Sequence, residues 1–162
     1  APNRSSAKLA GGYSQGVEPI AANLYMDDDA KGLHIRRNPF LEQLLESKGK
    51  NLPQVWDAIS EDKGSVINVR CMSVEEKAVF KTGFEIPQEA ILRLASSRQR
   101  YIDQGQSLNL FIDKRHSEEY ISYIHQIAFN DPYIKGLYYL IGKREADESD
   151  VAVEPVVCES CQ

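Results

Sequence analysis

The sequence predicts an α/β fold that looks incomplete in this chain, and three segments in its last third carry that prediction. Residues 107–112 alternate polar and apolar side chains, which is typical of a strand. Residues 117–130 have helical spacing, and residues 136–141 form a continuous apolar run between glycines, which indicates a buried strand. A strand, a helix and a second strand over this length predict parallel strands with a right-handed crossover. A parallel sheet needs more neighbours than these two strands.

Length and composition limit the possible functions. The 162 residues suit one domain or a piece of a larger one, and 42% apolar with 27% charged residues is an ordinary globular balance. A net charge of -5 and a pI of about 5.3 disfavour a general nucleic-acid binder, because phosphate neutralisation needs clustered basic charge. No apolar run approaches the roughly 20 residues of a membrane span, and the first residues lack the pattern of a secretory signal.

The first forty residues predict one short helix and one pair of strands. A helical stretch at 7–10 follows polar residues that suit a helix start, and two glycines end it. Residues 24–26 and 33–35 have strand character and would pair across the acidic turn at 27–29.

Helices dominate the middle of the chain, each with a recognisable start. These starts are Asn38 before Pro39, the segment 51–53, the capping box from Ser73 to Glu76, and Pro87. Gly49 ends the first helix, and residues 62–64 form a turn. The apolar residues assigned to the successive helices are Phe40, Leu41, Leu44 and Leu45; Val55, Trp56 and Ile59; Val79, Phe80 and Phe84; and Ile91, Leu92, Leu94, Ala95 and Tyr101.

An acidic segment at 145–162 predicts a flexible tail after a folded unit at 1–144. The tail ends in Cys158 and Cys161, a spacing that allows an intramolecular disulfide and its exchange with other thiols. Zinc binding and the absence of any function are the alternatives. Zinc needs four ligands, and only Cys71 and three scattered histidines remain, so a metal site within the chain is not expected. An odd, small number of cysteines favours a reducing compartment, as in the cytoplasm.

Tyr138 and Tyr139 lie in the second predicted strand of the last third. Adjacent strand residues point to opposite faces, so the simpler interpretation places one ring in the core and one against a neighbouring helix. The alternative is a stacked pair for stepwise radical transfer, which needs a kink that turns both rings together.

Two further polar segments have both a structural and a functional interpretation. Asn3, Ser5 and Ser6 at the first helix N-terminus, with Arg4 beside them, could cradle an anion or simply cap the helix. The amide-rich segment 98–111 could hold a partner's backbone or satisfy its own turn groups.

The order and spacing of several stretches resemble one family, the C-terminal part of the large catalytic subunit of class I ribonucleoside-diphosphate reductase. The resemblance runs over nearly the whole chain and includes, in particular, residues 2–7, 16–19, 23–25, 31–32, 38–39, 79–82, 98–111 and 137–140, and the tail cysteines. It implies the C-terminal part of a ten-stranded α/β barrel, incomplete alone, with helical insertions and a flexible tail.

The resemblance also implies roles for individual residues. Tyr138 and Tyr139 match the dyad that passes a radical from the small subunit to a catalytic cysteine. Cys158 and Cys161 match the tail pair that re-reduces the active-site disulfide and is reduced by thioredoxin or glutaredoxin. The helix from Ser117 and the strand after it match the region where the small subunit's C-terminus docks. The loop that binds the substrate's phosphates at a helix N-terminus matches Pro2, Asn3, Arg4, Ser5 and Ser6.

The family's thiyl-radical cysteine, active-site disulfide and effector sites lie upstream of this chain. We therefore expect reductase activity only together with an N-terminal large-subunit chain and a small subunit that carries a di-iron/tyrosyl radical cofactor, with no cofactor in this chain. A split subunit of phage type, in the host cytoplasm, is the favoured interpretation, and a truncation would look the same in sequence. The rival functions are a non-catalytic remnant that binds the small subunit and a stand-alone thiol-redox protein.

Overall fold

The structure is a computed structural model that describes residues 4–11, 14, 16–29 and 32–142. Local sequence signals fix where two of its helices start. The Asn38 side chain accepts the Phe40 N–H, and Pro39 begins the next helix. Ser73 and Glu76 form the reciprocal capping box. The elements are α1 (Arg4–Leu9), β1 (Leu24–Asp29), β2 (Gly32–Arg37), α2 (Pro39–Ser47), α3 (Pro53–Glu61), α4 (Val74–Val79), the 3-10 helix η1 (Gly83–Glu85), α5 (Gln88–Gln99), β3 (Leu110–Ile112), α6 (Glu118–Asn130) and β4 (Leu140–Gly142).

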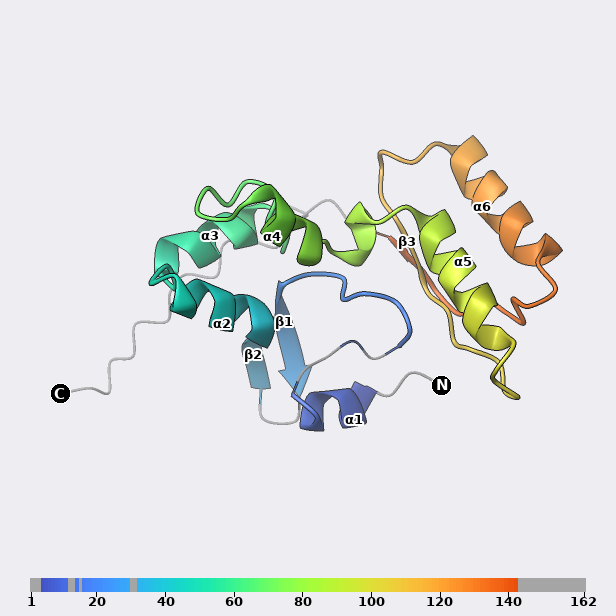
Figure 1. The fold of residues 1–162 in the computed structure, drawn as a ribbon, viewed down its shortest axis with the longest axis horizontal. Coiled ribbons are helices and arrows are strands. Elements are labelled where there is room, and N and C mark those ends of the chain that lie inside the picture. Colours follow the sequence, from blue (N-terminus) through green and yellow to red (C-terminus); the bar gives the residue numbers. More distant parts are fainter. Residues whose placement is uncertain (1–3, 12–13, 15, 30–31, 143–162) are drawn as a thin grey trace.

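One half of the molecule holds α2, α3 and α4 beside the antiparallel hairpin of β1 and β2 (Figure 1). Asn23 joins these parts: its buried amide donates to the carbonyls of Gly64 and Phe80, and its side-chain oxygen accepts from Asn38. The apolar side chains buried in this half are Leu41, Leu45, Trp56, Ile59, Val66, Val69 and Met72.

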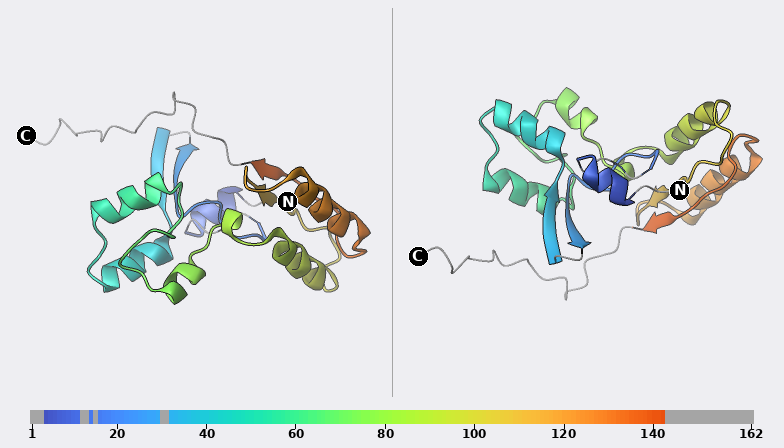
Figure 2. Two further views of the ribbon diagram at one scale, coloured as in Figure 1. Left: turned by 90° about the horizontal axis from the view of Figure 1, so that it is seen from above. Right: turned by 90° about the horizontal axis from the view of Figure 1, so that it is seen from below.

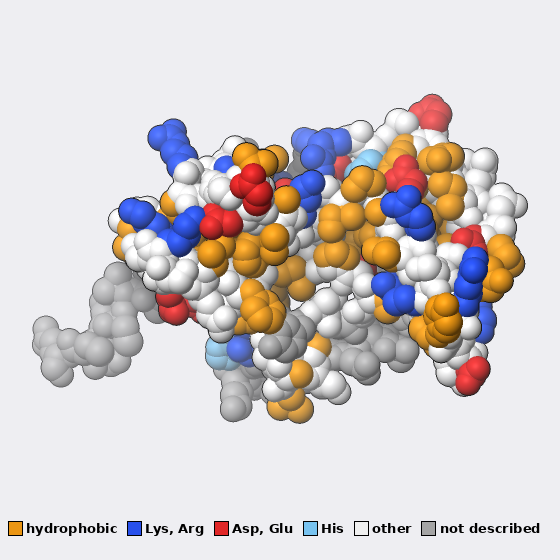
Figure 3. All heavy atoms as spheres, in the orientation of Figure 1, with side chains coloured by type: hydrophobic (Ala, Val, Ile, Leu, Met, Phe, Trp, Pro, Cys, Tyr) orange, Lys and Arg blue, Asp and Glu red, His pale blue; other side chains and the backbone are white. Residues whose placement is uncertain are grey.

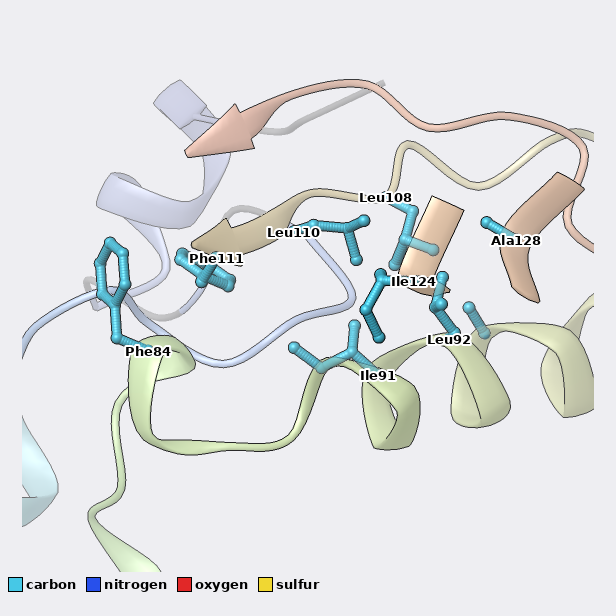
Figure 4. Close-up of a cluster of buried hydrophobic side chains, with 9 residues drawn as sticks. Phe84, Ile91, Leu92, Leu108, Leu110, Phe111, Ile124 and Ala128 are labelled. Carbon is cyan, nitrogen blue, oxygen red and sulfur yellow. The ribbon is translucent and has the colours of Figure 1, made fainter. Parts of the chain in front are cut away.

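The other half holds α5 and α6 against the parallel pair of β3 and β4 (Figure 4). The Phe111 ring meets Phe84 of η1 edge to face at 5.2 Å between centroids. The fully buried Gln88 side chain accepts the Phe111 N–H and donates to the carbonyls of Gly83 and Ile86, which ties α5 to β3. The buried cluster consists of Phe84, Ile91, Leu92, Ala95, Leu108, Leu110, Phe111, Ile124 and Ala128. Figure 2 shows α1 between the two halves.

The strand and pairing predictions are confirmed, but several strand bounds were wrong. β3 and β4 are parallel and α6 connects them, as expected. β3 covers 110–112 instead of 107–112, and β4 covers 140–142 instead of 136–141. β4 is also largely exposed, because only β3 pairs with it in the described part of the chain. The acidic residues 27–29 belong to β1 and are not a turn.

Some helix bounds also differ from the prediction. The first helix begins at Arg4 instead of Ala7, so the polar residues predicted to precede it form its first turn. α4 ends at Val79, and Phe84 lies in η1, because residues 80–82 break the helix. Tyr101 follows the end of α5 and is exposed instead of contributing to an apolar face.

Apolar side chains remain on the surface of both halves (Figure 3). Leu94 of α5 and Phe129 of α6 are among them, and Leu33 and Ile35 extend along the hairpin. The two-stranded sheet of β3 and β4 does not close a barrel within the described residues. Among those residues, no helix is long and apolar enough to cross a membrane.

Candidate functional site

The rings of Tyr138 and Tyr139 contact each other directly before β4. Their centroids lie 4.2 Å apart with the planes tilted by 56°. Both side chains are exposed, at 51% and 59% of their surface. The expectation of one core ring and one ring against a helix is therefore wrong. The structure has the alternative arrangement, in which the two rings contact each other.

The pair lies just ahead of the regular ladder between β3 and β4, which begins at Leu140. Ahead of it, Tyr138 N–H donates to the Leu108 carbonyl at 2.8 Å, and Leu110 N–H donates to the Tyr139 carbonyl at 2.9 Å. The Tyr139 N–H donates to a side chain, Asn109 Oδ1, at 3.2 Å. Leu108 and Leu110 are fully buried, so the backbone that carries the pair is anchored in the core.

A buried carboxylate near the start of the chain forms a hydrogen bond with Asn109. Asn109 Nδ2 donates to Glu18 Oε1, and the two residues are 91 positions apart. The Ser14 hydroxyl donates to the Glu18 carbonyl and fixes the backbone of that segment. Glu18 is 6% exposed, and its Oε2 has no hydrogen-bond partner in the described part of the chain.

Sequence reasoning did not assign a role to Glu18, and it treated Asn109 only as one of several amides. The available signal was a single carboxylate inside the apolar stretch 17–22. Carboxylates are rarely buried without a specific partner, so that position predicted a contact but not its identity.

The phenol of Tyr139 influences the ionisation of Tyr138. Tyr139, as hydrogen-bond partner and as a nearby ionisable group, raises the pKa of Tyr138 above its ordinary value. The hydroxyl of Tyr138 thus stays protonated at neutral pH. Two adjacent phenols are suited to exchange of a hydrogen atom, as an electron with its proton.

The amide-rich segment satisfies its own backbone. Gln99 Nε2 donates to the carbonyls of Ile102 and Gln104, and Gln106 Nε2 donates to that of Ala95. These contacts support the structural interpretation of this segment. Asn109 is the member of the segment that contacts the tyrosine pair.

The remaining predicted site residues are described only in part. The backbone of Arg4, Ser5 and Ser6 forms the first turn of α1, while Pro2 and Asn3 lie outside the described residues. Cys158 and Cys161 also lie outside them, as does the predicted tail at 145–162. Within the described ranges, no three His, Cys, Asp or Glu side chains come together as a metal site requires.

Parallel strands joined by a helix, with helices packed on the strands, are the local architecture of an α/β barrel. A model of the family described as "Ribonucleotide reductase, barrel domain" matches residues 1–140. The chain belongs to this family.

Relatives and solved structures agree with this assignment. The chain is 42% identical over 140 residues to a protein of Frog virus 3 and 35% identical over 156 residues to one of Invertebrate iridescent virus 6, both named as ribonucleoside-diphosphate reductase large subunits. These matches cover 86% and 94% of this chain but 24% and 16% of the relatives. The class Id ribonucleotide reductase alpha subunit of Actinobacillus ureae superposes with a TM-score of 0.72 at 33% identity, over 88% of this chain and 25% of that one. The chain thus spans about a quarter or less of these proteins.

Proposed function

We propose that this chain acts as the C-terminal part of the large subunit of a class I ribonucleoside-diphosphate reductase. In this role it works with a chain that supplies the rest of the large subunit and with a radical-carrying small subunit. The product would be deoxyribonucleotides made from ribonucleoside diphosphates. Family membership supports the class of reaction, and the chain matches about a quarter of the length of the Frog virus 3 relative.

The observation that carries this proposal is the contact between the rings of Tyr138 and Tyr139. A relay between subunits needs phenol groups that lie next to each other and stay protonated until they are oxidised. In each step, one phenol gives an electron and a proton to a neighbouring phenoxyl radical, so the first residue is oxidised and the second is reduced. The oxidant that starts the series is the radical of the small subunit, and this chain supplies the path.

Two further parts of the proposal depend on the family resemblance. Pro2, Asn3, Arg4, Ser5 and Ser6 bind the substrate's phosphates through the N-terminal turn of α1. Cys158 and Cys161 carry reducing equivalents from thioredoxin or glutaredoxin to the active site. The di-iron/tyrosyl radical cofactor resides in the small subunit. The two named large-subunit relatives are both viral, and the narrower phage origin stays a prediction.

The experiment is affinity purification of the tagged chain from its native cell, followed by an assay of ribonucleoside-diphosphate reduction. Recovery of a complementary large-subunit chain and a small subunit, with activity, is the expected result. Recovery of the small subunit alone without activity would favour a non-catalytic binding remnant. Disulfide reduction by the chain without either partner would favour a thiol-redox protein.

A further inference from the structure

The contact between Glu18 and Asn109 fixes which way the Asn109 amide faces. A carboxylate only accepts hydrogen bonds, so Glu18 can engage only the NH₂ group of Asn109. The amide oxygen is then left to face the Tyr139 N–H, which donates to it. A neutral glutamine at position 18 could present either its oxygen or its NH₂ group, and would not select one orientation.

Burying this carboxylate carries a cost in free energy. Glu18 is only 6% exposed, and its Oε2 has no hydrogen-bond partner among the described residues. A buried carboxyl group with incomplete hydrogen bonding is costly relative to an apolar side chain. The stability of the fold therefore does not account for a glutamate at position 18, whereas the orientation of Asn109 does.

The hydrogen bonds that begin at Glu18 lead through Asn109 to the tyrosine pair. The Tyr139 amide lies outside the regular β3–β4 ladder, and Asn109 Oδ1 is the acceptor of its hydrogen bond. Both phenol side chains are exposed, so few packing contacts restrain the rings. Control over their relative placement must come largely from the backbone that carries them.

We propose that Glu18 is a positioning residue for the Tyr138–Tyr139 pair and acts through Asn109. This inference rests on the proposed function of the pair as a radical relay. Glu18 exchanges no proton or electron in this role. It sets the backbone geometry in which a hydrogen atom passes from one phenol to a neighbouring phenoxyl radical.

The test exchanges donor and acceptor between the two residues, in the complex of this chain with its large-subunit partner and small subunit. Asn109→Asp removes the donor and sets two carboxylates against each other. Adding Glu18→Gln to that variant restores the hydrogen bond with its direction reversed, because the amide at position 18 donates and the carboxylate at position 109 accepts. The other oxygen of that carboxylate can still accept the Tyr139 N–H. Glu18→Ala removes the support altogether.

We expect Glu18→Ala and Asn109→Asp each to lower kcat by about 10- to 100-fold, with the substrate KM unchanged, because small displacements of reacting groups are costly. The exchanged double variant should recover most of kcat. Hydrogen exchange of the Tyr139 N–H, followed by mass spectrometry, should be faster in the single variants and slow again in the double variant. Glu42→Ala, which removes an exposed carboxylate paired with Arg37, is the matched control and should leave kcat and this exchange unchanged.

Three results would overturn the inference. They are wild-type kcat in Glu18→Ala, a raised KM with unchanged kcat, and a double variant no better than Asn109→Asp although it assembles. An inactive wild-type complex would instead refute the proposed function. In that case, the hydrogen-exchange rate of the Tyr139 N–H still decides whether Glu18 positions this backbone. An unchanged rate in both single variants would show that it does not. If Glu18→Ala reduces assembly, Asn109→Asp and the double variant keep the test decisive, because they are compared with each other at equal occupancy.

Discussion

The rings of Tyr138 and Tyr139 meet with centroids 4.2 Å apart, although adjacent residues of a regular strand point to opposite faces. The pair lies ahead of β4, where the Tyr139 N–H bonds to the Asn109 side chain and not to a strand. The two phenols therefore meet on an exposed surface, outside the regular ladder.

Replacing either tyrosine with phenylalanine should abolish turnover and leave assembly intact. Tyr138→Phe and Tyr139→Phe remove only the O–H bond that a radical relay needs, while the ring and its packing remain. Steady-state reduction of ribonucleoside diphosphates measures turnover, and gel filtration of the complex measures assembly. Tyr101→Phe, at an exposed tyrosine outside the pair, is the control with full activity expected. Normal turnover in either dyad variant would contradict the relay.

The sequence predicts the features of this site that depend on neighbouring residues, but not the contacts between residues far apart in the sequence. The tyrosine pair was visible as two adjacent residues, and the need for a kink followed from strand geometry. The support from Glu18 was not visible, because it joins residues 91 positions apart and one carboxylate in an irregular segment has no local signature. The clustered amides were ambiguous for the same reason, since Gln99 and Asn109 differ in role only through their partners in space.

The tail cysteines should matter for repeated turnover but not for a single cycle. Cys158→Ser or Cys161→Ser removes one sulfur of the proposed shuttle, while the active site keeps its own reducing equivalents for one reaction. Turnover with thioredoxin or glutaredoxin should fall to near zero, while pre-reduced enzyme without added reductant should still complete the one cycle that the active-site dithiol supplies. Cys71→Ser, at a cysteine packed beside the buried cluster of the first half, is the control. Unchanged multiple turnover would refute the shuttle.

The fold shows the same division between local and long-range information. The helices from Asn38 and Ser73 begin where predicted, because a side chain caps the backbone within a few residues. The lengths of β3 and β4 were overestimated, since a strand extends only as far as a partner pairs with it, and that partner is remote in sequence. The exposure of Leu140 follows from the same missing neighbours and not from its apolar character.

Substitutions at two glycines can separate the cost of backbone strain from the cost of a steric clash. Gly49 and Gly64 both have positive φ, at +62° and +85°. A Cβ at Gly49 would meet nothing within 4 Å, whereas one at Gly64 would lie 2.4 Å from the Ala22 Cβ. Gly49→Ala should lower the free energy of unfolding by about 1 kcal/mol through conformational strain alone.

Gly64→Ala should cost about 1 to 3 kcal/mol more, because the Asn23 N–H bonds to the Gly64 carbonyl and holds the two segments together. Urea unfolding of the purified protein measures both changes. Ala22→Gly combined with Gly64→Ala should recover part of the loss. Equal costs at the two glycines would show that the segments separate freely.

The contact between Tyr120 and Glu89 should make the free energy of unfolding depend on pH in the alkaline range. The Tyr120 hydroxyl donates to Glu89 Oε2 at 2.9 Å, and its ring stacks on His116. Burial and this hydrogen bond to a carboxylate both raise the pKa of Tyr120, because an ionised phenol would lose hydration and face a like charge. The folded protein therefore holds the proton more tightly than the unfolded chain does.

A raised pKa in the folded state gives stability that is complete below the unfolded pKa, which is about 10 for tyrosine. It is lost as the pH rises through the folded pKa. The difference in unfolding free energy between wild type and Tyr120→Phe should thus be constant up to about pH 9, at about 1 kcal/mol, and shrink above about pH 10. Urea unfolding of both proteins at a series of pH values measures this difference. A difference that grows with pH would mean that Tyr120 ionises more readily in the folded protein, contrary to its contact with Glu89.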